Sequence, residues 1–288
     1  MTTITVLSPA KVNLTLEVLG KRPDRYHEIR SIMQPVDLFD EVKIDVLDGT
    51  GIDIQTKGLK IPRGNRNLAW KAADIFIKES GLRAKVSIFI KKVIPAGAGL
   101  GGGSSNAAGV LVGLNKITKK LSQHDLNTLA PKIGADVAFF LGCRSALAEG
   151  IGEKITTIKD LPLFHYILIN PEFEISTRDI YKQWDKLQTG ATKRDDIGET
   201  IALFRKGEFP LRNDLEQPAI VLYPEIKILK ELLLSLGIEA TSMTGSGPTV
   251  FAVFREETEG LEIYNYLKTS TKYRVFYVKG LAGWHRLR

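Results

Sequence analysis

The chain has 288 residues, of which 43% are hydrophobic and 25% are charged, a balance typical of a globular protein that buries a substantial core. Its single cysteine, Cys143, excludes an internal disulfide, and the absence of a signal-peptide pattern or a membrane-length apolar run leads us to expect a cytoplasmic protein without a membrane partner. A net charge of +7 suits anionic metabolites, but the basic residues are dispersed without a zinc-ligand or RNA-binding motif, so we expect no nucleic-acid partner.

The first half of the chain alternates between predicted strands and helices. Apolar residues at positions 12, 14, 16 and 18 alternate with polar ones, which predicts a half-buried strand with Lys11 and Asn13 on its polar face. The stretch 41–58, EVKIDVLDGTGIDIQTKG, predicts a β-hairpin around turn residues 48–51. Further along we expect a helix over 67–80, a strand over 85–92, a helix over 104–119, and strands over 145–150 and 164–170.

The second half has a different character. We expect helices over 177–187, 197–206, 224–236 and 257–269, and strands over 239–245, 249–254 and 273–280. These elements alternate with little sign of β-hairpins, which favours a compact α+β layer. The change of character near 156–161 leads us to divide the chain into domains 1–158 and 159–288.

A glycine-rich segment precedes the helix predicted at 104–119. The stretch 94–109, IPAGAGLGGGSSNAAG, holds six glycines and two serines. Such a loop running into a helix offers backbone N–H groups and the positive end of the helix dipole to a phosphate, and Ser104 and Ser105 are spaced to cap that helix. Neither the Walker loop nor the dinucleotide fingerprint fits the spacing. The alternative is a tight strand-to-helix turn that needs glycine for close packing.

A second, shorter glycine cluster lies at 243–251, MTGSGPTVF, between two predicted strands. It is typical of a β-turn and equally of a second loop that faces phosphate. The sequence alone leaves both open.

Three motifs resemble the signature motifs of the GHMP kinases, small-molecule kinases related to galactokinase, homoserine kinase and mevalonate kinase. They are SPAKVNLTLEV at 8–18, PAGAGLGGGSSNAAG at 95–109 and GSGPTVF at 245–251. With RYHEI, IGADVAFFL, AEGIGE and NDLE, the resemblance narrows to the branch whose acceptor is a cytidine-diphosphate-linked methylerythritol. Arg25 stands where that branch usually has glycine, and Ala138 where it usually has proline.

The resemblance implies a two-layer α+β (α/β) GHMP kinase fold. An N-terminal ATP-binding domain and a ferredoxin-like C-terminal α+β domain would enclose the active site in the cleft between them. The activity implied is transfer of the γ-phosphoryl group of ATP, with Mg²⁺, to the 2-hydroxyl of the acceptor, a step of the non-mevalonate isoprenoid pathway. We expect a monomer or a weak homodimer.

The resemblance also implies roles for individual residues. Asp136 would be the catalytic base and Lys11 its electrostatic partner; without the resemblance they read as a helix cap and a solvated strand residue. The residues expected at ATP are Asn67, Leu68, Pro95, Ala96, Gly97, Ala98, Gly99, Leu100, Gly101, Gly102, Gly103, Ser104 and Ser105. The residues expected at the acceptor are Asn13, Tyr26, His27, Asp136, Thr177, Tyr181, Gly245 and Ser246.

Within the acceptor site, Tyr26 and Tyr181 would sandwich the cytosine and His27 would hydrogen-bond it. We assign no protein residue as a metal ligand beyond Ser105 as a candidate. His124, His165 and His285 lack metal-ligand spacing, and Trp70, Trp184 and Trp284 are expected to pack.

Two alternatives remain at this point. One is a GHMP kinase for another small alcohol, of the homoserine or mevalonate type, which would not need the nucleobase residues Tyr26, His27 and Tyr181. The other is a non-catalytic anion-binding or RNA-binding protein on the same fold, against which Lys11 and Asp136 argue.

Overall fold

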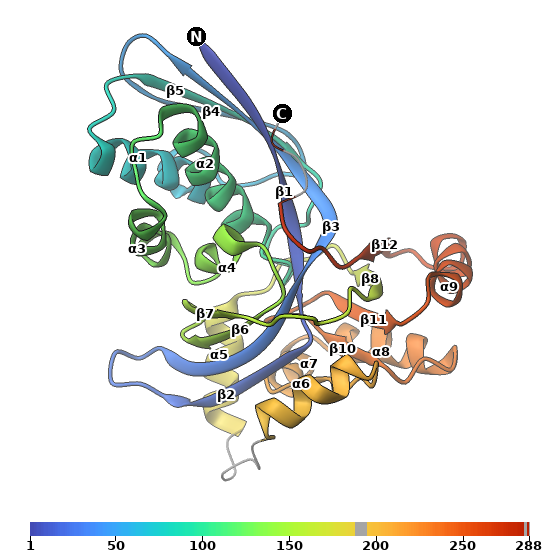
Figure 1. Cartoon of the computed structure of the whole chain (residues 1–288). Helices are drawn as coiled ribbons and strands as arrows, with labels where there is room; N and C mark the ends of the chain where they lie inside the picture. The colour runs from blue at the N-terminus through green and yellow to red at the C-terminus, as the bar shows by residue number, and fades with distance from the viewer. Residues whose placement is uncertain (188–194, 285–286, 288) are drawn as a thin grey trace.

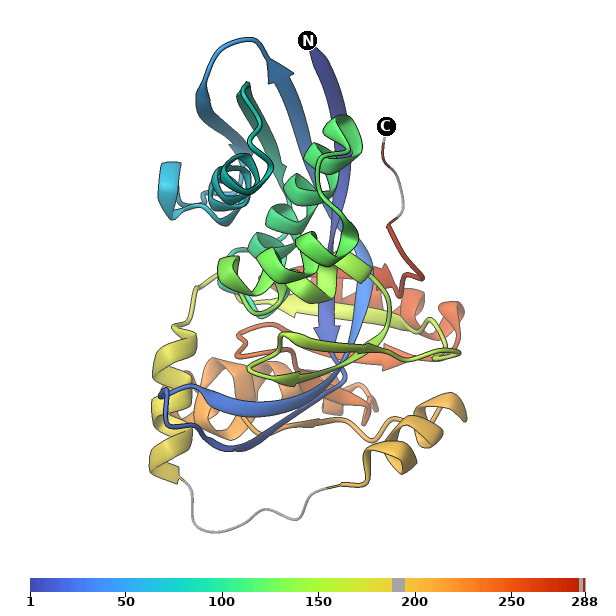
Figure 2. The ribbon, with the colours of Figure 1, turned by 60° about the vertical axis from the view of Figure 1, so that its left-hand side comes forward.

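The computed structural model describes residues 1–187, 195–284 and 287 of the chain. Two β-sheets, each covered by helices, meet along the first strands of the chain (Figures 1 and 2). Helices α1 to α4 gather on one side of the long N-terminal strands, and the smaller sheet lies at their other end with α8 and α9. Over the described residues, no helix is long and apolar enough to cross a membrane.

The larger sheet is organised around one long strand, β3, which pairs antiparallel with β1, β2, β5 and β6. Its strands are β1 (Thr2–Asn13), β2 (Thr15–Lys21), β3 (His27–Leu47), β4 (Gly51–Gly58), β5 (Lys85–Lys92), β6 (Ala146–Gly150), β7 (Lys154–Thr157) and β9 (Arg212–Asn213). The segment that accompanies it contains the 3₁₀ turn η1 (Gly64–Arg66) and helices α1 (Leu68–Ser80), α2 (Gly102–Thr118), α3 (Gln123–Ile133) and α4 (Val137–Gly142).

The hairpin predicted over 41–58 does not form. Strands β3 and β4 both pair with β5, which lies between them, antiparallel to β3 and parallel to β4. The apolar side chains of β5 at Val86, Ile88 and Ile90 are fully buried in this position. Helix α1 carries the chain from β4 to β5 and packs Phe76 into the same core. Burial of a distant apolar strand therefore outweighed the local turn signal.

The half-buried strand predicted over 11–18 is wrong in two respects. It is two strands, because β1 ends at Asn13 and β2 begins at Thr15. Both faces are buried: Lys11 and Asn13 are only 3% and 4% exposed. The second face is covered by the C-terminal half, where the Thr244 hydroxyl accepts a hydrogen bond from the Asn13 N–H at 3.0 Å.

The smaller sheet is antiparallel throughout, in the order β10-β11-β8-β12. Its strands are β8 (His165–Asn170), β10 (Thr241–Met243), β11 (Val250–Phe254) and β12 (Arg274–Lys279). The second half also contains α5 (Thr177–Leu187), α6 (Ile197–Arg205), α7 (Glu216–Leu222), α8 (Glu225–Ser235) and α9 (Glu257–Ser270). The helices predicted there are confirmed to within a residue at each end, and α7 is an additional helix that was not predicted. Strands β10 and β11 form a hairpin closed by the second glycine cluster, which agrees with the β-turn alternative for that cluster but not with the expectation of few hairpins.

The two sheets share a hydrophobic core. Val12 and Leu14 from the N-terminal strands pack in one cluster with Tyr166 and Leu168 of β8 and Phe251 of β11. Strand β9, from the second half of the chain, also adds a parallel pairing to β2. The division near residue 158 therefore runs through packed structure, and we retain it as a proposal about function.

Candidate active site

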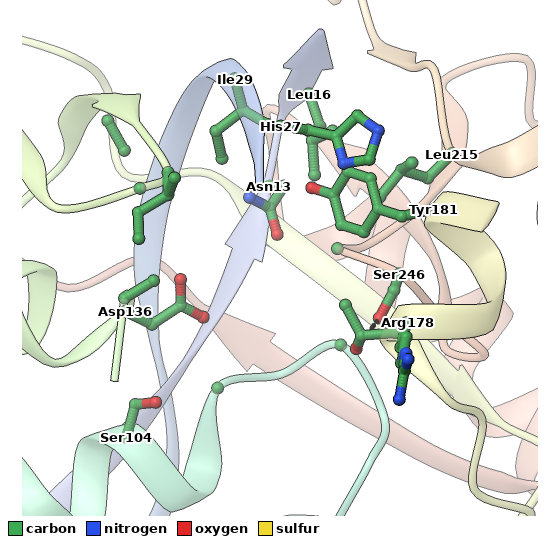
Figure 3. Close-up of a pocket in the computed structure, with 18 of the residues that line it drawn as sticks. Asn13, Leu16, His27, Ile29, Ser104, Asp136, Arg178, Tyr181, Leu215 and Ser246 are labelled. Atoms are coloured by element: carbon green, nitrogen blue, oxygen red, sulfur yellow. Dashed lines mark hydrogen bonds between the residues drawn. The ribbon is translucent and has the colours of Figure 1, made fainter. Parts of the chain in front are cut away.

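A cavity of about 960 Å³ opens between the two halves of the molecule (Figure 3). The structure brings most of the predicted site residues to its walls. These are Lys11, Asn13, Tyr26, His27, Leu68, Pro95, Ala96, Gly97, Ala98, Gly99, Gly101, Gly102, Gly103, Ser104, Asp136, Thr177, Tyr181, Gly245 and Ser246.

Three predicted residues do not line the cavity. Leu100 and Ser105 are completely buried. The side chain of Asn67 caps α1, since its Oδ1 accepts the Ala69 N–H at 2.9 Å and its Nδ2 donates to the Pro62 carbonyl at 2.9 Å. Asn67 therefore positions the start of α1 rather than facing the cavity.

The glycine segment forms the turn into α2. That helix begins at Gly102, and its N-cap is Gly101 with φ +69°, so Ser104 and Ser105 lie inside the first turn and are not the caps we expected. A side chain could not replace Gly99, because it has φ +74° and an added Cβ would lie 2.0 Å from the Thr244 carbonyl oxygen. At Gly103 an added Cβ would meet nothing closer than 3.7 Å. Close packing thus explains some of the glycines, while others leave the backbone open to the cavity.

One buried carboxylate holds both ends of this loop. Asp40 of β3 accepts the N–H groups of Val93 and Ile94 at 2.7 and 2.9 Å, where the loop begins. Its other oxygen accepts from the Lys92 ammonium and from the Asn106 amide of α2. Asp40 and Lys92 are 0% and 1% exposed. Burial lowers the pKa of Lys92, and the Asp40 charge opposes that effect.

Lys11 and Asp136 meet at the centre of the cavity. The Lys11 ammonium donates to the Asn13 side chain and to the Gly99 carbonyl at 2.7 Å, and it lies 4.0 Å from Asp136 Oδ2. Burial lowers the pKa of Lys11, and the Asp136 charge partly offsets this.

The Asp136 carboxylate is partly exposed, since 34% of its side-chain surface is accessible. It stands at the N-cap of α4 but makes no capping hydrogen bond. The helix-cap interpretation therefore finds no support, and the carboxylate is accessible from the cavity.

An aromatic cluster forms the other end of the cavity. The His27 ring stacks on Tyr181, with centroids 4.7 Å apart at 20°, and meets the edge of Trp184 at 5.4 Å. Its Nε2 lies 2.7 Å from Asp185 Oδ1. Tyr26 lines the rim with 60% of its surface exposed. Tyr181 is thus stacked on His27, and its predicted pairing with Tyr26 across the base stays a prediction.

Charged residues that sequence reasoning missed also line this end. Arg178, Lys182 and Asp185 project from α5 beside Thr177 and Tyr181, and Lys21 and Arg25 lie across from them. Residues 177, 178, 181, 182 and 185 follow the helical repeat, so the periodicity of the predicted helix was the available signal. Arg25 keeps a left-handed backbone, with φ +70°.

Five described histidines and tryptophans do not line the cavity, namely His124, His165, Trp70, Trp184 and Trp284. His165 pairs with the Tyr277 hydroxyl at 2.7 Å, Trp184 packs on His27, and Trp284 donates to the Leu141 carbonyl at 3.4 Å. His285 falls outside the described residues. Within residues 1–187, 195–284 and 287, no three His, Cys, Asp or Glu side chains are grouped so as to hold a metal ion.

Comparisons with known proteins agree on one family. The models for the GHMP kinases N terminal domain and the GHMP kinases C terminal match residues 67–143 and 191–272. A 4-diphosphocytidyl-2-C-methyl-D-erythritol kinase of Geobacter sp. (strain M21) is 42% identical over 264 residues, covering 89% of this chain and 91% of that protein.

Solved structures show the same relationship. The crystal structure of a 4-(cytidine 5′-diphospho)-2C-methyl-D-erythritol kinase matches with a TM-score of 0.84 and 33% identity, covering 97% of this chain and 100% of that one. A homoserine kinase from Cytophaga hutchinsonii matches with a TM-score of 0.74 and 18% identity, covering 100% of this chain and 97% of that one, and so shares the fold.

Proposed function

The chain belongs to the GHMP kinases, and we propose that its acceptor is 4-(cytidine 5′-diphospho)-2-C-methyl-D-erythritol, phosphorylated at the 2-hydroxyl. The family and its named relatives make it an ATP-dependent small-molecule kinase of isoprenoid biosynthesis. The observation that carries the choice of acceptor is the end of the cavity lined by Tyr26, His27 and Tyr181. A homoserine or mevalonate acceptor has no base that would need these rings.

We assign the nucleotide to the glycine-loop end of the cavity. The backbone N–H groups at the start of α2 and the hydroxyl of Ser104 face the space where the ATP phosphates would lie. Leu68 is available to the adenine, held there by the cap that Asn67 makes on α1. Domain 1–158 would in this way hold ATP, while domain 159–288 completes the acceptor pocket.

Mg²⁺ fits the donor set at this end. The hydroxyl of Ser104 is an oxygen donor that lines the cavity, whereas Ser105, the candidate ligand from the sequence, is buried away from it. The ion would neutralise charge on the β- and γ-phosphates. The remaining chemistry belongs to side chains of the protein.

Asp136 accepts the proton of the acceptor's 2-hydroxyl while the oxygen of that hydroxyl attacks the γ-phosphorus of ATP. The bond between the γ-phosphorus and the β,γ-bridging oxygen breaks, and ADP leaves. The ammonium of Lys11, 4.0 Å from the carboxylate, stabilises the negative charge on the transferred group. Asn13 orients that ammonium, because its Oδ1 accepts from Lys11 while its Nδ2 donates to Ser31 Oγ at 2.7 Å.

A pair of hydroxyl groups also lines the cavity. Thr177 of α5 and Ser246 of the second glycine cluster hydrogen-bond each other at 2.8 Å. Together with the backbone of Gly245 they suit the diphosphate that links cytidine to the acceptor alcohol. We further propose a cytoplasmic enzyme that is a monomer or weak homodimer.

The direct test is turnover of the purified protein with ATP, Mg²⁺ and the cytidine-linked acceptor, with the product identified by mass spectrometry. The expected product carries one additional phosphate at the 2-position, which fragmentation or phosphorus NMR locates. Homoserine and mevalonate serve as matched acceptors that the enzyme should not phosphorylate. Turnover of either of them in place of the cytidine compound would reassign the substrate.

A further inference from the structure

The imidazole of His27 is held from two sides. Its side chain is only 7% exposed, and the Nε2 atom lies 2.7 Å from Asp185 Oδ1. Tyr181 covers one face of the ring. In Figure 3 the ring lies over Tyr181 with one nitrogen directed outward and the other toward the interior of the cavity.

The proton on this ring follows from what surrounds Asp185. An ionised carboxylate only accepts hydrogen bonds, and an ammonium only donates them. Lys21 donates to Oδ2 of Asp185, and His27 meets Oδ1. Partial burial favours the neutral acid, but the bonds from Lys21 and His27 outweigh it and lower the pKa of Asp185. The Nε2 atom must therefore carry a proton and donate it.

Nδ1 of a neutral His27 is then an acceptor. Over the part of the chain that the structure describes, no hydrogen bond occupies Nδ1, and His27 lines the cavity. A centroid separation of 4.7 Å marks an offset stack, which leaves part of the Tyr181 face uncovered. A planar base in line with the imidazole would lie over that uncovered part, with its edge toward Nδ1.

We infer that Asp185 is a positioning residue that fixes the Nε2–H tautomer of His27 and so makes the pocket select an amino-bearing pyrimidine. This inference rests on the proposed cytidine acceptor. The exocyclic amine of cytosine donates a hydrogen bond to an acceptor such as Nδ1. Uracil has a carbonyl at the same position, and a lone pair of its oxygen would face the lone pair of Nδ1, which is repulsive. Asp185 thus determines the discrimination between the two bases without contacting the base, because it acts through His27.

Because of Lys21, the substitution Asp185→Asn should move the ring proton of His27 from Nε2 to Nδ1. The introduced amide has one oxygen and one NH₂ group, and the donor-only Lys21 claims the oxygen. The NH₂ group is left facing Nε2 of His27, which must then accept, so the ring proton moves to Nδ1. Nδ1 becomes a donor, which suits the carbonyl of uracil and opposes the amine of cytosine.

Nitrogen-15 NMR of the ligand-free protein at about pH 8.5, where an ordinary imidazole is neutral, reads the tautomer directly. We expect the His27 proton on Nε2 in the wild type and on Nδ1 in Asp185→Asn. Calorimetric titration with CDP and UDP then measures base preference, and the ratio of CDP to UDP affinity should fall about ten- to a hundredfold in the variant.

Asp179→Asn is the matched control. Asp179 lies on the same helix and pairs with Lys182 at 3.0 Å, so the substitution removes the same charge without touching His27. It should change neither the tautomer nor the CDP to UDP ratio. Lys21→Met added to Asp185→Asn frees the amide to turn, and the proton should return to Nε2.

An unchanged tautomer in Asp185→Asn, or an inverted tautomer with an unchanged affinity ratio, would overturn the inference. Neither result depends on turnover. The proposed acceptor is judged separately, by whether the wild-type enzyme phosphorylates the cytidine compound, so the failure of one is distinguishable from the failure of the other.

Discussion

The two ends of the cavity differ in the groups that line them, which are mainly backbone at one end and side chains at the other. The nucleotide end is largely backbone, a loop of glycines held from beneath by the buried pair of Asp40 and Lys92. The pyrimidine end is made of side chains from the β2–β3 turn and from α5 (Figure 3), and it includes the exposed ring of Tyr26 and the surface pair of Lys21 and Asp185.

The difference reflects what each end must recognise. Phosphates are bound by fixed N–H groups, which work only if the backbone is rigid before the ligand arrives. A base is distinguished by the arrangement of donors and acceptors on its edge, which side chains and their protonation states supply. One end therefore depends on rigid burial and the other on the hydrogen-bonding state of a few side chains. Substitutions at each end should separate these dependences.

The largest effect is expected where the two ends meet, at Asp136. Asp136→Asn removes the proposed proton acceptor while keeping the shape of the side chain, so kcat should fall about 10²- to 10⁴-fold. Affinity for ATP and for CDP should remain near wild type. Asp74→Asn, at an exposed ion pair on α1, is the control. If the Asp136 variant kept half of the wild-type kcat, the base would have to be another group.

The next effect tests the rigidity of the nucleotide end. Asp40→Asn leaves the buried Lys92 ammonium without its counter-charge, and breaking a buried pair in this way costs about 3–5 kcal/mol of unfolding free energy. Urea unfolding measures it. Asp74→Asn should cost below about 1 kcal/mol, as exposed pairs do. Equal stability of the two variants would show that the buried pair does not support the loop.

A smaller and more local change breaks the loop itself. Gly99→Ala adds a Cβ that would lie 2.0 Å from the Thr244 carbonyl oxygen, at a φ of +74°. The loop must shift, and we expect the KM for ATP to rise about tenfold or more. CDP affinity should hardly change. Gly142→Ala, where an added Cβ meets nothing within 4 Å, is the matched control. Parallel weakening of both ligands would argue that the ends are not independent.

A local effect of similar size is expected at the exposed rim of the pyrimidine end. Tyr26→Ala should weaken CDP by about 1–3 kcal/mol, the usual contribution of one ring stacked on a base, and leave ATP affinity unchanged. Tyr266→Ala removes a ring of similar exposure on α9 and should affect neither ligand. Isothermal titration distinguishes the variants. CDP affinity at the wild-type level would mean that Tyr26 does not stack on the base.

The sequence was sufficient to predict those features that depend only on interactions between residues close together in the chain. The helix over 177–187 begins and ends where its periodicity indicated, because an amphipathic repeat marks the buried face of a helix directly. The dense glycines of 94–109 indicated an unusual backbone for a similarly local reason, since few other residues adopt positive φ. The motifs around Lys11 and Asp136 indicated a catalytic pair through resemblance to a known family.

Other features depended on residues far apart in the chain. The turn at 48–51 indicated a hairpin, yet β5 paired between its two strands because its apolar residues are buried there. The alternation at Lys11 and Asn13 indicated a solvent-facing side, which the C-terminal half covers.

The two residues that we propose to decide base recognition, Asp185 and His27, are also far apart in the sequence. Asp185 lies 158 residues from His27 in the chain, and no spacing rule connects them. Sequence by itself indicated the family, most of the helices and the unusual backbone of the glycine segment, because motifs, short periodicities and composition encode them, whereas it did not predict α3, α4 and α7. Only the tertiary structure decided which strands pair, which charges are buried and which nitrogen of His27 carries a proton, because each depends on contacts between segments that meet only in the folded chain.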